Sequence, residues 1–263
     1  MKLKITITNK KNQRLFEQSA TDEIFATYDG EYQEGDKISI EADENPSFII
    51  LTLDDCMQES FAYLNGKFTL EIPFAEKKMS YNPKAFTGTR HYIFARKASV
   101  AEISAPKNLA FNPFDCHENK SLFPHTWANV ETRGESVFAS RNAIDGYLAN
   151  TFHGEWPYSS WGINKNPNAE FHLEFGRKVR IDTVEIYLRA DFPHDAWWTK
   201  GQIDFSDGSS LTLEFEKRGD CQRFTFKPKI VEGLTLSKLI KAEDPSPFPA
   251  LTQIKIYGTE ADI

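Results

Sequence analysis

The sequence predicts an all-β protein made of two β-sandwich domains. Short segments with alternating apolar and polar residues recur along its 263 residues, and turn signals such as Asn65-Gly66 separate them. The segment 136–143 is the only one expected to form a short helix. Because strands outnumber helices throughout and the chain is long enough for two ordinary domains, two packed β-sandwiches are the expected architecture.

The first domain is assigned to residues 1–105. Its β-branched and aromatic segments predict strands at 4–8, 36–41, 48–53, 68–72 and 91–96. Pro106 interrupts the strand pattern within 104–108, which places the domain boundary there. Since this linker is short, we expect the two domains to pack together and not to swing freely.

The second domain is assigned to residues 106–263. Strands are predicted at 171–175, 179–189, 202–205, 211–215, 223–226, 233–240 and 252–257. The sequence Ser206-Asp207-Gly208-Ser209 predicts a β-hairpin between two of them. A set of short antiparallel strands of this kind favours a sandwich with jelly-roll connections.

Charge and composition argue against several classes of partner. The net charge is −7 and the sequence shows no run of lysine and arginine that would form a basic patch, so we expect neither a nucleic-acid nor a membrane partner. The first residues alternate like a strand, without the apolar core of a signal peptide, which predicts a cytoplasmic protein. The three cysteines, Cys56, Cys116 and Cys221, are far apart and are expected to be free thiols.

Aromatic and polar residues gather in loops of the second domain. All five tryptophans lie between positions 127 and 198, and the loops 150–161, 189–198 and 241–251 also carry planar polar side chains. Aromatic rings take the apolar faces of sugars, while planar polar groups bind the hydroxyls. The candidate sugar-binding residues are His153, Trp156, Arg189, Asp191, His194, Asp195, Trp197, Trp198 and Phe248.

Structural interpretations of the same residues remain open. Trp161 suits the core as well as a ligand platform. One of Trp197 and Trp198 should point inward, because neighbours on an extended chain alternate. Arg189 could instead form a scaffold ion pair with Asp191 or Asp195.

Several motifs of the second domain resemble a known family. Ala143-Ile144-Asp145-Gly146 and Asn150-Thr151, followed by a tryptophan, are similar to the calcium-loop signature of discoidin-like domains. These domains, also called coagulation-factor type C domains, include the family 32 carbohydrate-binding modules. The resemblance continues in strands at 168–176, 181–186 and 251–258 and covers about residues 107–260, with nothing comparable before it.

The resemblance implies a galactose-binding-like jelly roll in which loops at one rim carry the ligand, so that the three loops would meet. It also implies a structural calcium ion held by Asp145, by Asn150 or Thr151, and by backbone carbonyls. The family usually adds a glutamate where this chain has Gln253, and a neutral amide brings no charge. The alternative is that Asp145 only caps its turn.

The predicted function is non-catalytic binding of a carbohydrate, either galactose-like or another soluble glycan. One alternative is a hydrolase or lyase that uses Asp191, His194 and Asp195. The sequence lacks the nucleophile, zinc-protease and phosphate-loop motifs that would favour other enzyme classes. Another alternative is a protein-interaction module whose surface is the first domain. The sequence does not predict an oligomeric state.

Overall fold

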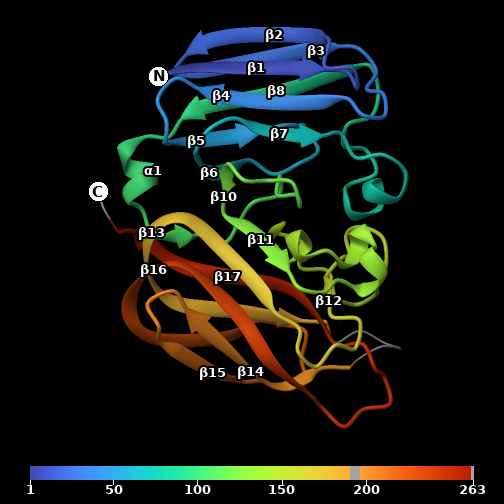
Figure 1. Ribbon diagram of the computed structural model, residues 1–263, viewed down its shortest axis with the longest axis vertical. Coiled ribbons are helices and arrows are strands. Elements are labelled where there is room, and N and C mark those ends of the chain that lie inside the picture. Colours follow the sequence, from blue (N-terminus) through green and yellow to red (C-terminus); the bar gives the residue numbers. More distant parts are fainter. Residues whose placement is uncertain (190–195, 262–263) are drawn as a thin grey trace.

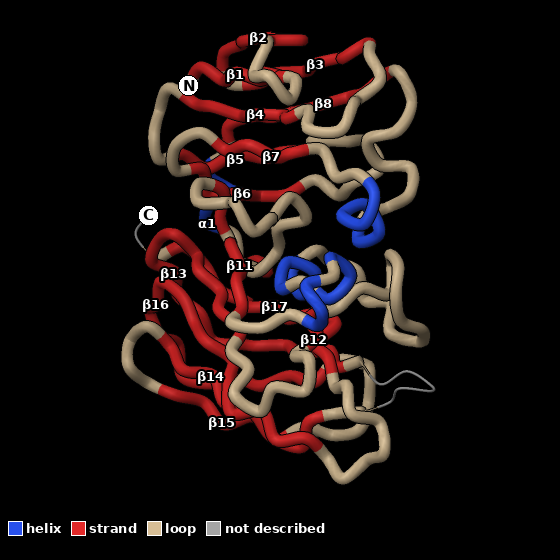
Figure 2. Tube along the Cα trace, turned by 45° about the vertical axis from the view of Figure 1, so that its right-hand side comes forward, coloured by secondary structure: helices blue, strands red, loops and turns tan. Residues whose placement is uncertain are grey.

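The computed structural model describes residues 1–189 and 196–261 and shows two stacked β units, the N-terminal one above the C-terminal one (Figure 1). Short helical segments near the junction complete the fold (Figure 2). They are η1 (Ala75–Ser80), α1 (Val100–Ser104), η2 (Thr132–Gly134), η3 (Ser136–Phe138) and η4 (Ser140–Ile144). Among the described residues, no helix combines the length and apolar character that crossing a membrane needs.

The N-terminal unit is a sandwich of two antiparallel sheets. One sheet has the order β2-β1-β4-β7 and the other β10-β6-β5-β8-β3. Their strands are β1 (Lys2–Thr8), β2 (Arg14–Thr21), β3 (Glu23–Asp29), β4 (Lys37–Ala42), β5 (Ser47–Thr52), β6 (Ser60–Leu64), β7 (Phe68–Glu71), β8 (Arg90–Lys97) and β10 (Leu122–Phe123). In β1, Leu3, Ile5 and Ile7 are fully buried, as the alternation in the sequence predicts.

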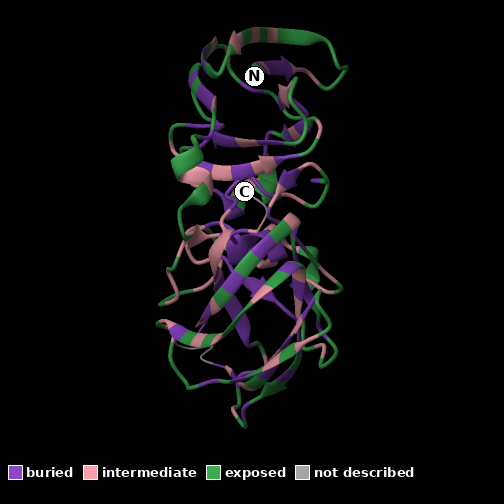
Figure 3. Cartoon of the chain, turned by 90° about the vertical axis from the view of Figure 1, so that its left-hand side faces the viewer, coloured by how far each residue is buried: buried purple, intermediate pink, exposed green. Residues whose placement is uncertain are grey.

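The C-terminal unit is one strongly bent antiparallel sheet with the path β12-β17-β13-β16-β14-β15. In addition, β11 pairs with β13, and β9 pairs with β17. The strands are β9 (Lys107–Asn108), β11 (His125–Ala128), β12 (Trp161–Gly162), β13 (Phe171–Leu188), β14 (Trp198–Phe205), β15 (Ser210–Glu214), β16 (Gln222–Lys241) and β17 (Ala250–Glu260). Buried and exposed residues alternate along the long strands (Figure 3).

Two long strands correct the predicted strand boundaries. The predicted segments 171–175 and 179–189 belong to one strand, β13, which ends at Leu188, and 223–226 and 233–240 are parts of β16. Register shifts between Glu174 and Val179 bend β13 without ending it. Gly176 lies in this bend with φ +67°, and a Cβ there would come within 2.4 Å of the Phe123 ring. The sequence pattern predicts two separate strands here, because glycine and charged residues interrupt the alternation of apolar and polar residues.

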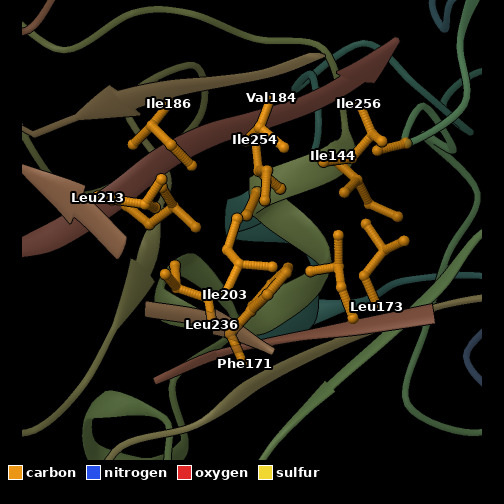
Figure 4. Packing of buried hydrophobic residues seen from close by; sticks show 14 of the residues in the cluster. Ile144, Phe171, Leu173, Val184, Ile186, Ile203, Leu213, Leu236, Ile254 and Ile256 are labelled. Carbon is orange, nitrogen blue, oxygen red and sulfur yellow. The ribbon is translucent and has the colours of Figure 1, made fainter. Parts of the chain in front are cut away.

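The bent sheet encloses the second hydrophobic core. Apolar side chains from the two halves of β13, from β14 to β17 and from η4 converge in it (Figure 4). Ile144 reaches this core from η4, and Val184 and Ile254 reach it from paired strands. The core therefore fixes the position of η4 and of the turn that follows it.

The predicted helix and the helix found differ. The segment 136–143 forms η3 and η4, which are short 3-10 turns, so the prediction of one helix there is wrong in detail. The chain also forms α1, which begins with a capping box between Ser99 and Glu102. That Ser-x-x-Glu pattern is visible in the sequence and could have located α1.

The chain passes between the two cores more than once near the predicted boundary. Leu109 packs in the second core, but Phe114 and Leu122 pack in the first. Leu122 also pairs with Leu64 as part of β10. The division into 1–105 and 106–263 stays a prediction, and residues 113–123 contribute to the N-terminal unit.

Hydrogen bonds connect η1 of the N-terminal unit to loops of the C-terminal unit. The backbone amide of Trp156 donates to the carbonyl of Met79 over 2.8 Å. The backbone amide of Ser136 donates to Glu76 Oε1 over 2.6 Å, and its hydroxyl donates to the Glu76 carbonyl over 2.8 Å. The loop that carries His153 is thus held from the N-terminal side.

An ion pair near this junction predicts a pH dependence of stability. His117 Nε2 lies 2.8 Å from Glu131 Oε2, and this hydrogen bond raises the pKa of His117. Because the folded pKa exceeds the unfolded value of about 6.5, the stabilisation is complete below that pH and is lost as the pH rises through the folded pKa. The melting temperature of a His117→Gln variant should therefore lie further below that of the wild type at pH 6 than at pH 8.5. Thermal unfolding at the two pH values measures this difference.

His172 provides the control for this prediction. Burial lowers its pKa, so protonation at low pH destabilises the native state, and stability contributed through His172 rises with pH. His172→Gln should show the opposite trend, with the larger loss at pH 8.5. Equal losses at both pH values for His117→Gln would contradict the ion-pair argument.

Candidate functional site

A cavity of about 140 Å³ opens where η2, η3, β12, the end of β13 and the loop before β17 meet. Three of the predicted sugar-binding residues line it: His153, Arg189 and Phe248. These residues lie in the three different loops selected from the sequence. The described lining also includes Thr132, Arg133, Phe138, Gly162, Ile163, Pro249 and Ala250.

Arg189 is held firmly in the cavity wall. It directly follows β13, and its backbone amide donates to the carbonyl of Ala250 over 2.9 Å. Its Nη1 donates to Ser160 Oγ over 3.0 Å, and the guanidinium lies 5.8 Å from the centre of the Phe138 ring. The residue is only 5% exposed. A planar, permanently charged donor is therefore fixed beside the cavity.

Phe248 forms a more exposed wall. The ring is 37% exposed, and Lys165 Nζ lies 4.7 Å from its centre. Pro247 and Pro249 flank Phe248 and restrict the backbone, which lowers the entropy lost when a ligand binds.

Gly162 keeps the cavity open. A Cβ at this position would lie 2.6 Å from Thr132 Oγ1 and 3.2 Å from Phe138 Cδ1. Any larger residue would therefore displace the cavity wall. Thr132, Phe138 and Gly162 were not among the predicted site residues, and neither spacing nor composition distinguishes them in the sequence.

Trp198 does not lie where the sugar-binding prediction needs it. It is fully buried in the second core, with its ring 6.4 Å from that of Trp161. Trp161 is also fully buried, which decides between its two interpretations in favour of the core. Of the neighbouring pair Trp197 and Trp198, the second points inward. Trp198 is fully buried in the second core, whereas Trp197 is only partly buried against it.

Of the other candidates, the two that are described, Trp156 and Trp197, are not part of the cavity lining. Trp197 is partly buried against the second core. Trp156 faces the N-terminal unit through Met79, and its ring meets Tyr147 edge-on at 5.1 Å. Asp191, His194 and Asp195 lie outside the described residues.

The turn that resembles a calcium loop brings together two of its four predicted ligands. Gln253 Nε2 donates to Asp145 Oδ1 over 2.7 Å and also to the carbonyl of Asn142. Asn150 instead donates its side-chain amide to the carbonyl of Gly219, and Thr151 is exposed. Because Gln253 directs a donor at the atoms that should bind the ion, the described arrangement does not fit calcium.

Charge at this turn is deeply buried. Burial raises the pKa of Asp145 to about 7, although Arg141 acts in the opposite direction. Arg141 donates through Nε to the carbonyl of Asp115 and through Nη2 to that of Pro113, each over 2.8 Å. Its guanidinium also lies 4.3 Å from the centre of the Tyr81 ring.

Solved structures of carbohydrate-binding modules resemble this chain. A fucose-binding module of Streptococcus pneumoniae is 12% identical, with a TM-score of 0.43, over 59% of this chain and 99% of that chain. A family 32 module from C. perfringens NanJ, solved with galactose, is 18% identical, with a TM-score of 0.38, over 50% of this chain and 91% of that chain.

A chitosan-binding module from a Paenibacillus sp. IK-5 chitosanase/glucanase is 16% identical, with a TM-score of 0.41, over 59% of this chain and 100% of that chain. No protein-family model matches the chain, and no curated protein matches it. The fold described above rests on the strand order and register of the chain itself.

Proposed function

We propose that the protein binds a carbohydrate without transforming it, and that the cavity between Arg189, His153 and Phe248 receives one sugar residue. The observation that carries this proposal is the meeting of a fixed guanidinium, an imidazole and two aromatic rings around one small cavity. Aromatic faces suit the C–H surface of a sugar ring, and planar donors suit its hydroxyls.

The size of the cavity limits the size of the ligand that fits. Pockets for drug-sized ligands enclose roughly 300–1,000 Å³. A space of about 140 Å³ suits a single terminal sugar or a monosaccharide. We therefore propose recognition of a chain end, with the rest of the glycan in solvent.

The residues that line the cavity also test whether it suits a glycoside hydrolase. A typical glycoside hydrolase needs two carboxyl groups about 5–10 Å apart. No aspartate or glutamate belongs to the described lining of the cavity. The enzyme alternative therefore depends on Asp191 and Asp195, which are outside the described residues. Incubation with chromogenic glycosides tests it, since any turnover lost in Asp191→Asn would favour that alternative. The protein-interaction alternative stays a prediction.

A thermal-shift screen of the intact protein tests the proposal. The first panel contains galactose, fucose-containing and chitosan oligosaccharides, because these are the ligands named for the similar solved structures. We expect one sugar class to raise the melting temperature in a concentration-dependent way. The absence of any response across a wide glycan array would contradict the proposal.

Replacing Phe248 with alanine should weaken binding of that sugar by about tenfold, because a partly exposed stacking ring contributes roughly 0.5–1.5 kcal/mol beyond its buried area. Isothermal titration measures the change. Phe25 is a matched control, since it is also exposed but lies on the N-terminal unit. Unchanged affinity in Phe248→Ala, or an equal loss in Phe25→Ala, would place the ligand elsewhere.

A further inference from the structure

We propose that the side-chain amide of Gln253 takes the place of a metal ion at the turn formed by residues 142–146, so that the C-terminal unit holds this turn without calcium. The inference concerns the closure of the turn and does not depend on the sugar proposal. It follows from the contacts of one buried side chain that reaches from β17 to the end of η4.

Gln253 closes the turn with three hydrogen bonds. Nε2 donates to the Asn142 carbonyl and, over 2.7 Å, to Asp145 Oδ1. Oε1 accepts from the backbone amide of Gly146 over 3.1 Å. One neutral group therefore joins both sides of the turn to the last strand, which is the task that an ion with several oxygen ligands would perform.

The partners fix the orientation of this amide. Asn142 and Asp145 offer only acceptor atoms to Gln253, whereas Gly146 offers a donor. Rotating the amide by 180° would set an oxygen against two oxygens and an NH₂ group against an N–H. Three favourable contacts would become three repulsive ones, so the NH₂ group is the part that lies between the carboxylate and the carbonyl.

A buried positive charge already lies close to the turn. The guanidinium of Arg141 is close enough to the carboxylate of Asp145 for an attractive electrostatic interaction. Arg141 is itself buried and held by backbone carbonyls. A divalent cation at this turn would lie near the buried positive charge of Arg141, which opposes its binding.

Two further atoms at the turn bear on metal binding in opposite directions. The side-chain amide of Asn150 donates to the carbonyl of Gly219, which occupies this predicted ligand with a partner other than the turn. Asp145 Oδ2 is buried and has no hydrogen-bond partner among the described residues. A cation bound at the turn would satisfy this oxygen, so direct metal titration is the decisive measurement.

The experiment compares the full chain with Gln253→Glu in EDTA and in millimolar CaCl₂. In the wild type we expect no change in melting temperature and no calcium-specific heat by titration calorimetry. In Gln253→Glu, two neighbouring carboxylates repel in EDTA and become a ligand pair in calcium. Its melting temperature should therefore fall in EDTA and rise again in calcium. The expected rise is about 5–10 °C, which corresponds to a free calcium concentration about 100 times the dissociation constant.

Gln222→Glu is the matched control. Gln222 is also buried in a strand and bonded to backbone atoms, those of Glu216 and Arg218. Its replacement should destabilise the protein equally in both buffers. A wild type stabilised by calcium, or a folded Gln253→Glu without a calcium response, would overturn the proposal. If Gln253→Glu does not fold, the wild-type titration decides: calcium binding overturns the proposal and its absence supports it.

Discussion

An Arg189→Ala variant should bind the ligand sugar at least about 30-fold more weakly than the wild type, because truncating a buried anchor residue typically removes 2 kcal/mol or more of binding free energy. Arg189 is almost fully buried, and its backbone and guanidinium are fixed by Ala250 and Ser160. Its donors are thus ordered before the ligand arrives, so little entropy is lost on binding.

Arg189→Lys separates charge from geometry. Lysine keeps the positive charge but lacks the planar fork, so affinity should remain well below that of the wild type. Arg90→Ala, an exposed arginine on the N-terminal unit, should bind normally. Titration calorimetry measures affinity, and the melting temperature shows whether each variant is folded. Wild-type affinity in a folded Arg189→Ala protein would exclude this cavity as the ligand site.

The largest effect on stability is expected for Trp161→Ala, at about 3–5 kcal/mol of the free energy of unfolding. Trp161 is fully buried between Phe171 and Trp198, with ring centres 5.4 and 6.4 Å away. Its indole nitrogen also donates to the carbonyl of Val130 over 3.0 Å, so truncation would leave both a cavity and an unpaired carbonyl. Urea denaturation measures the loss.

Trp127 is the control for this truncation. It is 42% exposed and stacks on His172 at the surface, with ring centres 3.6 Å apart. Trp127→Ala should therefore lose much less stability than Trp161→Ala. Similar losses for both variants would show that burial in the second core does not determine the contribution of Trp161.

The sequence predicts strands best where one face of the strand is buried and the other faces solvent. Leu3, Ile5 and Ile7 alternate with polar residues, and the same three side chains fill the first core. The alternation fails where a strand bends, because Gly176 and its charged neighbours resemble a loop. The pairing of β13 with β16 resumes at Val179 after the bend, and a local sequence pattern does not contain that long-range pairing.

The site was predictable only in part. His153, Arg189 and Phe248 lie far apart in the sequence, and their meeting was expected from the family resemblance, not from spacing. Loop composition could not separate Trp198 from surface aromatics, because burial depends on how the whole sheet bends. Phe138 reaches the cavity from a 3-10 turn whose position is set by contacts with both units, so no short motif identifies it.

The passage of residues 113–123 through the N-terminal unit has an evolutionary consequence. Phe114 and Leu122 fill the first core, and Leu122 supplies β6 with its outer neighbour. Genetic recombination at 104–108 would deprive the N-terminal fragment of these side chains and leave β6 with an unpaired edge. The same apolar side chains would be exposed on the C-terminal fragment. Binding modules that are exchanged freely between genes end cleanly at a linker. The two units of this protein should instead be inherited and duplicated as one piece.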